Sequence, residues 1–148
     1  MRVWSFLLLI LLPAAAGAEF PVPGIECAPR ICICQRAPEP VVIDGRLDDM
    51  AWRKADTVRL DVDIEGPGKP APAHATRVSL LWDDDYLYIG ATLAEPHLWA
   101  TLEERDAVIF HDNDFELFLD PDGDTHDYYE LEINALGTVW DLLIDRPY

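Results

Sequence analysis

Residues 110–141 read FHDNDFELFLDPDGDTHDYYELEINALGTVWD, and this stretch decides the fold. Apolar residues recur in it at every second position, which is the period of a β-strand that turns one face to a core. Phe115, Leu117 and Leu119 share one face of the first predicted strand. Glu116 lies on the opposite face. The alternation therefore predicts strands that are apolar on one side only.

Two more strands follow within the same stretch. The acidic run Asp120–Asp124 includes proline and glycine and predicts a turn, and Ala135–Gly137 predicts another. Between these turns, Tyr129, Leu131 and Ile133 alternate with Tyr128, Glu130, Glu132 and Asn134. The last predicted strand, Thr138–Ile144, has Trp140, Leu142 and Ile144 on one side. Short strands separated by turns are typical of an antiparallel β-sandwich, and we predict an all-β fold of this class.

The preceding part of the chain fits the same class. Thr76–Trp82 and Tyr86–Leu93 alternate in polarity around the turn Asp83–Asp85 and predict a β-hairpin. Trp52 is predicted to fill the core, because tryptophan buries a large apolar area. The remaining elements predicted here are short strands at Val41–Ile43 and Thr57–Asp63, helical turns within Leu47–Lys54 and near Thr101–Asp106, and a Pro- and Gly-rich loop at Glu65–Ala75.

The first residues predict export. Arg2, the apolar run Phe6–Leu12 and the small residues Ala16–Ala18 form a signal-peptide pattern, with cleavage after Ala18. The run is shorter than the ~20 residues that a membrane span requires, so we expect no span after cleavage. We therefore expect a secreted, periplasmic or cell-surface protein. Residues 19–40 are rich in proline and cysteine and are predicted to form an N-terminal arm.

The arm contains the three cysteines Cys27, Cys32 and Cys34, and their spacing fits no zinc site. In an oxidising compartment Cys27 could pair with either Cys32 or Cys34. A bridge between Cys32 and Cys34 would be strained. The sequence does not choose between these pairings, and one cysteine remains over.

The chain has 28 acidic and 11 basic residues and a formal net charge of −17. Such a charge repels nucleic acid and anionic membrane surfaces, so we expect neutral polymers or cations as partners. Calcium is one such cation. Asp120, Asp122 and Asp124 resemble the start of a calcium loop, although Thr125 and Leu131 stand where an EF-hand requires glycine and glutamate. We therefore predict at most a looser, structural calcium site at the three aspartates.

A polar surface is predicted on the sheet formed by residues 110–144. Its members are Glu116, Glu130, Glu132 and Asn134, with the aromatic residues Phe110, Tyr128 and Trp140 nearby. Hydroxyl groups of a sugar require such donors and acceptors, and its C–H faces stack on rings. The alternatives are an ordinary solvated strand face and a glycosidase, whose two catalytic carboxylates stand ~5–10 Å apart. We favour binding without catalysis.

Four blocks carry a resemblance to a known family. They are VVIDGRLDDMAW at 41–52, TRVSLLWDDDYLYIGATL at 76–93, RDAVIFHDNDFELFLDPDGD at 105–124 and YYELEINALGTVWDLL at 128–143. In order and spacing they resemble carbohydrate-binding module family 9 in its bacterial, family-9-like form. The resemblance implies a jelly-roll-like antiparallel sandwich, bound calcium and a sugar cleft between two aromatic rings. It also implies attachment to xylanases or other glycoside hydrolases.

The resemblance assigns roles to individual residues. Glu116 matches a sugar-contacting glutamate, and Asn134 matches an asparagine that closes the next strand. Phe110 takes the place of a stacking tryptophan, whereas Glu132 stands where an arginine contacts the sugar. The predicted ligand site comprises Phe110, Asp112, Glu116, Glu132, Asn134 and Trp140, with no catalytic residue.

The resemblance also divides the chain. It implies that residues 41–148 are the N-terminal portion of the binding domain, after the signal peptide at 1–18 and the arm at 19–40. The second stacking tryptophan belongs to a C-terminal half of the family domain that this sequence does not contain. We therefore expect an incomplete sandwich with exposed apolar surface and unpaired strand edges.

Overall fold

The computed structural model describes residues 30–66 and 68–147. The predicted signal peptide, residues 19–29 of the predicted arm and Cys27 lie outside the described residues. The chain divides into two units, Met1–Ile31 and Cys32–Tyr148, and the fold described below is that of the second. Within the described ranges, no helix has the length and apolar character needed to cross a bilayer.

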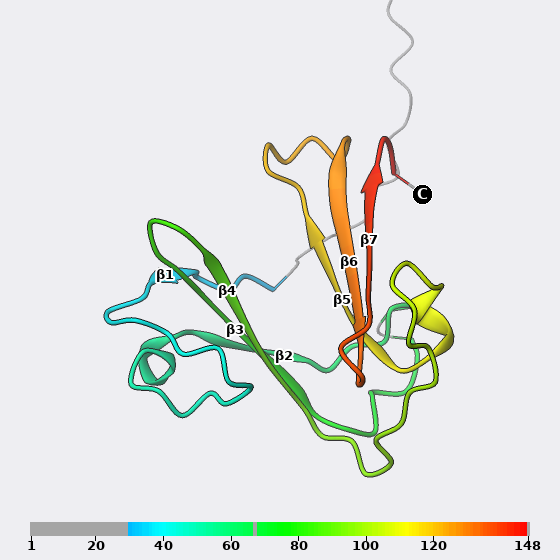
Figure 1. Cartoon of the computed structure of the whole chain (residues 1–148), viewed down its shortest axis with the longest axis horizontal. Helices are drawn as coiled ribbons and strands as arrows, with labels where there is room; N and C mark the ends of the chain where they lie inside the picture. The colour runs from blue at the N-terminus through cyan, green and yellow to red at the C-terminus, as the bar shows by residue number, and fades with distance from the viewer. Residues whose placement is uncertain (1–29, 67, 148) are drawn as a thin grey trace, which may run out of the picture. The chain divides into compact units, whose positions relative to one another are not determined.

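One sheet is built around β3 (Thr76–Trp82), as Figure 1 shows. β4 (Leu87–Leu93) pairs with β3 along its whole length, so the predicted hairpin is confirmed. On its other edge β3 pairs antiparallel with β2 (Thr57–Leu60) and parallel with the short β1 (Gln35–Arg36). The hairpin turn is fixed by Asp83, whose Oδ1 accepts the N–H groups of Asp85 and Tyr86, both at 2.8 Å.

The second sheet contains β5 (Asp114–Leu119), β6 (Tyr128–Asn134) and β7 (Val139–Ile144) in that order, all antiparallel. Figure 1 shows the three strands side by side. The pairing follows the predicted alternation, since Phe115 stands opposite Ile133 and Ile133 opposite Val139. Within the described residues, the two mostly antiparallel sheets, with 3₁₀ turns as the only helical elements, confirm the predicted all-β sandwich class.

Trp52 belongs to the buried cluster that packs against the first sheet. It is 8% exposed and packs with Ala51 and Leu81, both 0% exposed. The 3₁₀ turn η1 (Trp52–Lys54) presents the indole to the sheet and corresponds to the predicted helical turn. The prediction that Trp52 fills the core is therefore confirmed.

Two predicted elements are wrong, and both errors have a local cause. Val41–Ile43 is not a strand, because the Val42 N–H donates to Asp49 Oδ2 at 3.1 Å instead of to a neighbouring strand. No helical turn forms at Thr101–Asp106. The N–H groups of Thr101 and Leu102 donate to Asp112 instead, and the 3₁₀ turn η2 lies later, at Ile109–His111.

The apolar faces of β4, β5 and β6 line a cavity of about 540 Å³. Ile89, Leu117 and Ile133 lie on its wall, and Leu98 and Trp99 at its edge remain 75% and 48% exposed. Apolar side chains here are thus only partly removed from water.

Cys32 and Cys34 are both free thiols. The Cys32 thiol donates to the carbonyl oxygen of Asp56 at 3.7 Å. Partial burial, together with the neighbouring Cys32, raises the pKa of Cys34. No bridge joins the two residues, and Cys27, which could pair with either by sequence, lies outside the described residues.

Candidate functional site

Alternate side chains of β5, β6 and β7 form one polar and aromatic face, called here the carboxylate face. It consists of Asp114, Glu116, Phe118, Tyr128, Glu130, Glu132, Trp140 and Leu142. Glu132 stands opposite Glu116 on one side and opposite Trp140 on the other. A hollow of about 810 Å³ lies over this face, and Phe110 forms part of its wall.

Two aromatic rings meet at the hollow. The centroids of Phe110 and Trp140 are 5.9 Å apart, with the ring planes 37° from parallel. Phe110 is carried by η2 and is 54% exposed, and its edge-on contact with His111 spans 4.9 Å. The Phe110 N–H donates to Glu132 Oε2 at 3.0 Å. The ring is therefore anchored to the sheet through its own backbone.

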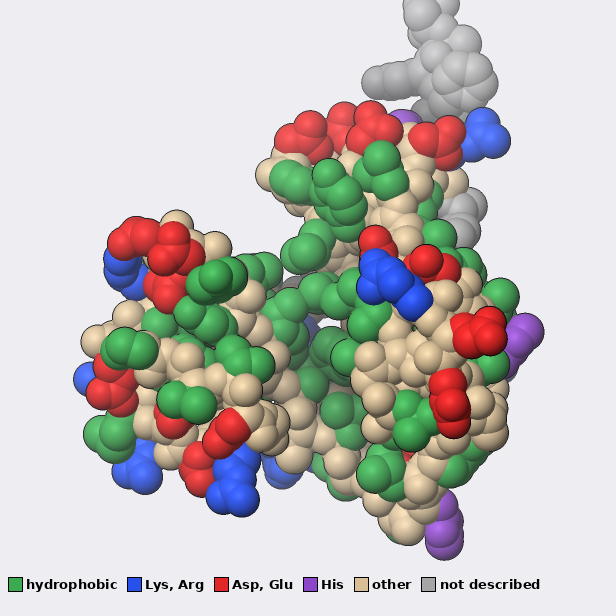
Figure 2. Space-filling view, viewed as in Figure 1, with side chains coloured by type: hydrophobic (Ala, Val, Ile, Leu, Met, Phe, Trp, Pro, Cys, Tyr) green, Lys and Arg blue, Asp and Glu red, His purple; other side chains and the backbone are tan. Residues whose placement is uncertain are grey.

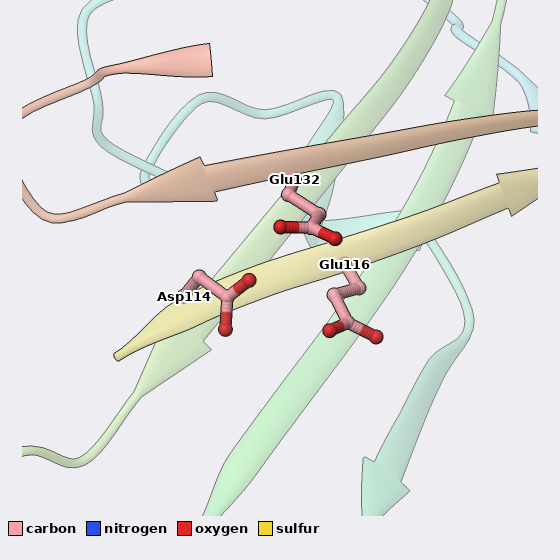
Figure 3. Close-up of side chains that lie close together, drawn as sticks. All are labelled: Asp114, Glu116 and Glu132. Carbon is pink, nitrogen blue, oxygen red and sulfur yellow. The ribbon is translucent and has the colours of Figure 1, made fainter. Parts of the chain in front are cut away.

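Asp114, Glu116 and Glu132 form a carboxylate trio on this face. One oxygen from each lies within 4.8 Å of the others, and Figure 3 shows the three carboxyl groups gathered on β5 and β6. Burial raises the pKa of all three carboxyl groups, and repulsion from Glu130 raises it further in each. Asp112 adds to the repulsion at Asp114, Asp114 adds to it at Glu116, and both Asp114 and Glu116 add to it at Glu132. Glu132 is 2% exposed, and Asp114 Oδ2 is buried without a hydrogen-bond partner.

Asp112 and Asn134 form a buried network at the end of the face. Asp112 accepts the backbone N–H groups of Thr101 and Leu102, the Thr101 hydroxyl and the Asn134 amide, at 2.8–2.9 Å. Burial alone would raise the pKa of Asp112, but these hydrogen bonds hold it at about 2. The network ties the loop at Thr101 to the start of β5.

The Asn134 amide is fully engaged. Its Nδ2 donates to Asp112 and to the Leu102 carbonyl, while Oδ1 accepts the N–H groups of Leu136 and Thr138 at 3.0 Å. An amide offers two donors and two acceptor lone pairs, and all four positions are satisfied by protein groups. Asn134 therefore shapes the β6–β7 turn and holds the loop beside the site.

The acidic turn between β5 and β6 is a second, separate cluster. Oxygens of Asp120, Asp122 and Asp124 lie within 4.8 Å of one another, and all three residues are largely solvent-accessible. Asp120 accepts the N–H groups of Thr125 and Gly123 at 2.8 and 2.9 Å, and these hydrogen bonds lower its pKa. Figure 2 shows acidic side chains gathered at the tip of this hairpin and at that of β3–β4.

The structure divides the predicted ligand residues into two groups. Phe110, Glu116, Glu132 and Trp140 come together at the hollow. Asp112 and Asn134 lie next to it with their polar atoms turned to protein partners. Asp114 is not among the predicted ligand residues, although the period of two that places Glu116 on this face also places Asp114 there.

The arrangement can perform two kinds of chemistry. The two rings offer apolar faces for stacking, and Glu116 offers exposed acceptors beside them. Stacking together with a few directed hydrogen bonds is how proteins recognise compact polyhydroxylated ligands. The trio adds oxygen ligands of the kind that hard cations require.

Comparisons with known proteins agree on one class of domain. A family model described as "Carbohydrate family 9 binding domain-like" matches residues 43–142. "Endo-1,4-beta-xylanase C" of Paenibacillus barcinonensis is 34% identical over 88 residues, which are 60% of this chain and 7% of the xylanase. The chain thus spans a small part of this relative's length. No solved structure matches the chain.

Proposed function

Because the chain belongs to the carbohydrate family 9 binding domain-like family, we propose that it is a secreted, non-catalytic module that recognises neutral sugars or polysaccharide ends. The family itself implies carbohydrate binding. The finer statement rests on the site, on the signal-peptide pattern before Glu19 and on the chain's charge of −17, which disfavours anionic polymers.

The observation that carries the proposal is the ring pair of Phe110 and Trp140, 5.9 Å apart beside the exposed Glu116. A pyranose ring stacks one C–H face on such an aromatic surface and directs hydroxyl groups to nearby carboxylates. We assign stacking to the two rings and hydrogen bonding to Glu116. Asp112 and Asn134 act by positioning, because their polar atoms already bind protein groups. Glu132 positions Phe110 through the hydrogen bond at its Oε2.

A catalytic domain is the proposed partner within a longer polypeptide. The matched relative is by name a xylanase, and the matched segment is 7% of it. A module of this kind increases the local concentration of an attached enzyme on its polymer, since linked binding sites act at high effective concentration. The module would thereby support polysaccharide catabolism.

Isothermal titration calorimetry with xylo- and cello-oligosaccharides tests the proposal. Binding is expected for the full chain, with a loss of about fivefold or more in Phe110→Ala and in Trp140→Ala, since stacking on one ring contributes on the order of 1 kcal/mol or more. Tyr86→Ala is the matched control, because Tyr86 is 66% exposed on the β3–β4 turn. Unchanged affinity in both ring variants would refute the site assignment.

A second candidate function follows from the trio. Glu116 and Glu132 stand opposite each other with raised pKa values, and a raised pKa is a property of general acids in glycoside hydrolases. Release of reducing ends from a polysaccharide by the full chain, abolished by Glu116→Gln or Glu132→Gln, would establish hydrolysis. Binding without product release supports the non-catalytic module.

Calcium at Asp120, Asp122 and Asp124 is proposed as a structural ion. The three exposed carboxylates lie close enough to share one cation. A melting temperature that falls with a chelator, and falls less in Asp122→Asn, would support this role. Chelator-sensitive melting with no sugar binding at all would instead favour a calcium-stabilised interaction domain.

A further inference from the structure

The three carboxylates of the trio repel one another, and a neutral sugar would not offset this repulsion. Asp114, Glu116 and Glu132 place three negative charges within 4.8 Å of one another on a partly buried sheet face. Among the described residues, the ion pairs involve other acids, and none neutralises a member of the trio. Charges of like sign in such a position are costly unless a counter-charge joins them.

One buried oxygen atom and one buried carboxylate point to a ligand at this place. Asp114 Oδ2 is inaccessible to solvent and has no hydrogen-bond partner. The Glu132 side chain is 98% removed from solvent, and within the described part of the chain its single hydrogen bond is the one from Phe110 to Oε2. Buried polar atoms are normally satisfied, so the unpartnered oxygen of Asp114, next to the buried carboxylate of Glu132, calls for a partner that the two acids share.

The spacing fits a cation of the size of calcium. Calcium binds about six to eight oxygens at about 2.3–2.6 Å, so two ligands on opposite sides of the ion stand about 4.6–5.2 Å apart. One oxygen from each member of the trio lies within 4.8 Å of the other two. We infer that Asp114, Glu116 and Glu132 bind a divalent, calcium-sized cation, and that hydroxyl groups of the sugar complete its coordination.

The second half of this inference rests on the proposed function, and the position of the rings supports it. Trp140 is paired directly opposite Glu132, and Phe110 is hydrogen-bonded to it. A sugar stacked on these rings therefore lies over the trio. Adjacent hydroxyl groups can replace water on a calcium ion, which retains solvent ligands when protein groups do not fill its sphere. The cation thus turns a repulsive carboxylate face into one that attracts hydroxyl oxygens.

Calorimetric titration of calcium into the chelator-treated full chain tests the cation site at pH 7. A binding event is expected that weakens at least tenfold in Asp114→Asn and in Glu132→Gln. Both changes are isosteric, and glutamine keeps an acceptor for the Phe110 N–H. Asp141→Asn is the matched control: Asp141 lies on the same sheet, opposite Leu131 on the other face, and pairs with Arg105.

Asp122→Asn separates this site from the acidic turn. The inference is supported if calcium binding is retained in Asp122→Asn and lost in Asp114→Asn and in Glu132→Gln. Absence of any calcium binding by the full chain would overturn it, as would an event that both trio variants retain. Circular dichroism of each variant shows whether a loss of binding reflects loss of the fold.

Sugar titrations with calcium and with chelator then distinguish the two proposals. A tenfold or greater weakening of sugar binding by chelator in the wild-type chain, absent from Asp114→Asn, supports cation-assisted recognition. Sugar binding that is equal in calcium and in chelator leaves the proposed function standing and overturns the sugar-coordination step. Calcium binding at the trio without any sugar binding overturns the proposed function and leaves the cation site.

Discussion

Glu132 Oε2 accepts the backbone N–H of Phe110 at 3.0 Å, so a carboxylate that is 2% exposed holds a ring that is 54% exposed. The hydrogen bond joins the 3₁₀ turn η2 to the middle strand of the second sheet. It makes the position of the ring depend on a charged group in a place where charge is unfavourable.

Two substitutions of Glu132 separate the contribution of its hydrogen bond to stability from the contribution of its charge. Glu132→Gln keeps an acceptor for the Phe110 N–H, whereas Glu132→Leu leaves that donor unsatisfied. We expect the leucine variant to be less stable than the glutamine variant by about 1–3 kcal/mol in its free energy of unfolding. Urea denaturation in the presence of chelator measures the difference. Equal stability of the two variants would show that the hydrogen bond does not hold the turn.

The pH dependence of stability follows from the raised pKa of Glu132. The pKa of Glu132 is higher in the folded chain than in the unfolded chain, so the folded chain binds this proton more tightly. Protonation of Glu132 therefore stabilises the fold. This stabilisation is complete below the pKa of the unfolded chain and is lost as pH rises through the pKa of the folded chain. Glu132→Gln should therefore exceed the wild type in stability at pH 7 without calcium. The difference should vanish below about pH 4, the range of an unfolded glutamate. Thermal melts between pH 3 and 8 measure it.

Asn134→Ala removes an amide whose four hydrogen-bonding positions are all used. It leaves the Asp112 carboxylate and two turn N–H groups with fewer partners. We expect a loss of about 2–4 kcal/mol in the free energy of unfolding. Asn113→Ala, at an exposed neighbouring position, is the control and should change stability by less than about 0.5 kcal/mol. A small effect of Asn134→Ala would mean that the network does not stabilise the loop.

Gly90→Ala tests the packing of Trp52 against β4. A Cβ at position 90 would lie 2.8 Å from Leu47 Cδ2 and 3.1 Å from Trp52 Cη2. The leucine can move, but the buried indole cannot, so we expect a loss of about 1–3 kcal/mol. Gly68→Ala meets no atom within 4 Å and serves as the control. Differential scanning calorimetry of both variants checks the contrast.

The alternation of apolar residues was sufficient to predict most of the fold. β3 has the predicted bounds, and the two hairpins of the second sheet lie where turn residues interrupt the period of two. Periodicity succeeds here because side chains of a strand must alternate between its faces. It failed at Val41–Ile43, where an apolar run suggested a strand but the Asp49 side chain binds the Val42 N–H.

The site was predictable as a face but not as a set of contacts. Strand period places Glu116, Glu132 and Asn134 on one side of the sheet, and the pairing bears this out. No local pattern indicates that the Asn134 amide donates to the carbonyl oxygen of Leu102, which is 32 residues away in the chain. Nor does one show that Glu132 would be buried beneath the backbone of Phe110. Such contacts depend on how distant segments meet.

The pairing of β6 also bears on how the sheet assembles. Glu116 and Glu132 stand directly opposite each other, and like charges in that relation oppose strand association. A slip of one residue would relieve them, but it would turn Leu131 and Ile133 out of the apolar cavity and send Glu130 and Glu132 into it. Burial of the apolar side chains of β6 therefore fixes the register that places the two glutamates opposite each other. The clustered acids are a consequence of strand registration, already in place before any ligand arrives.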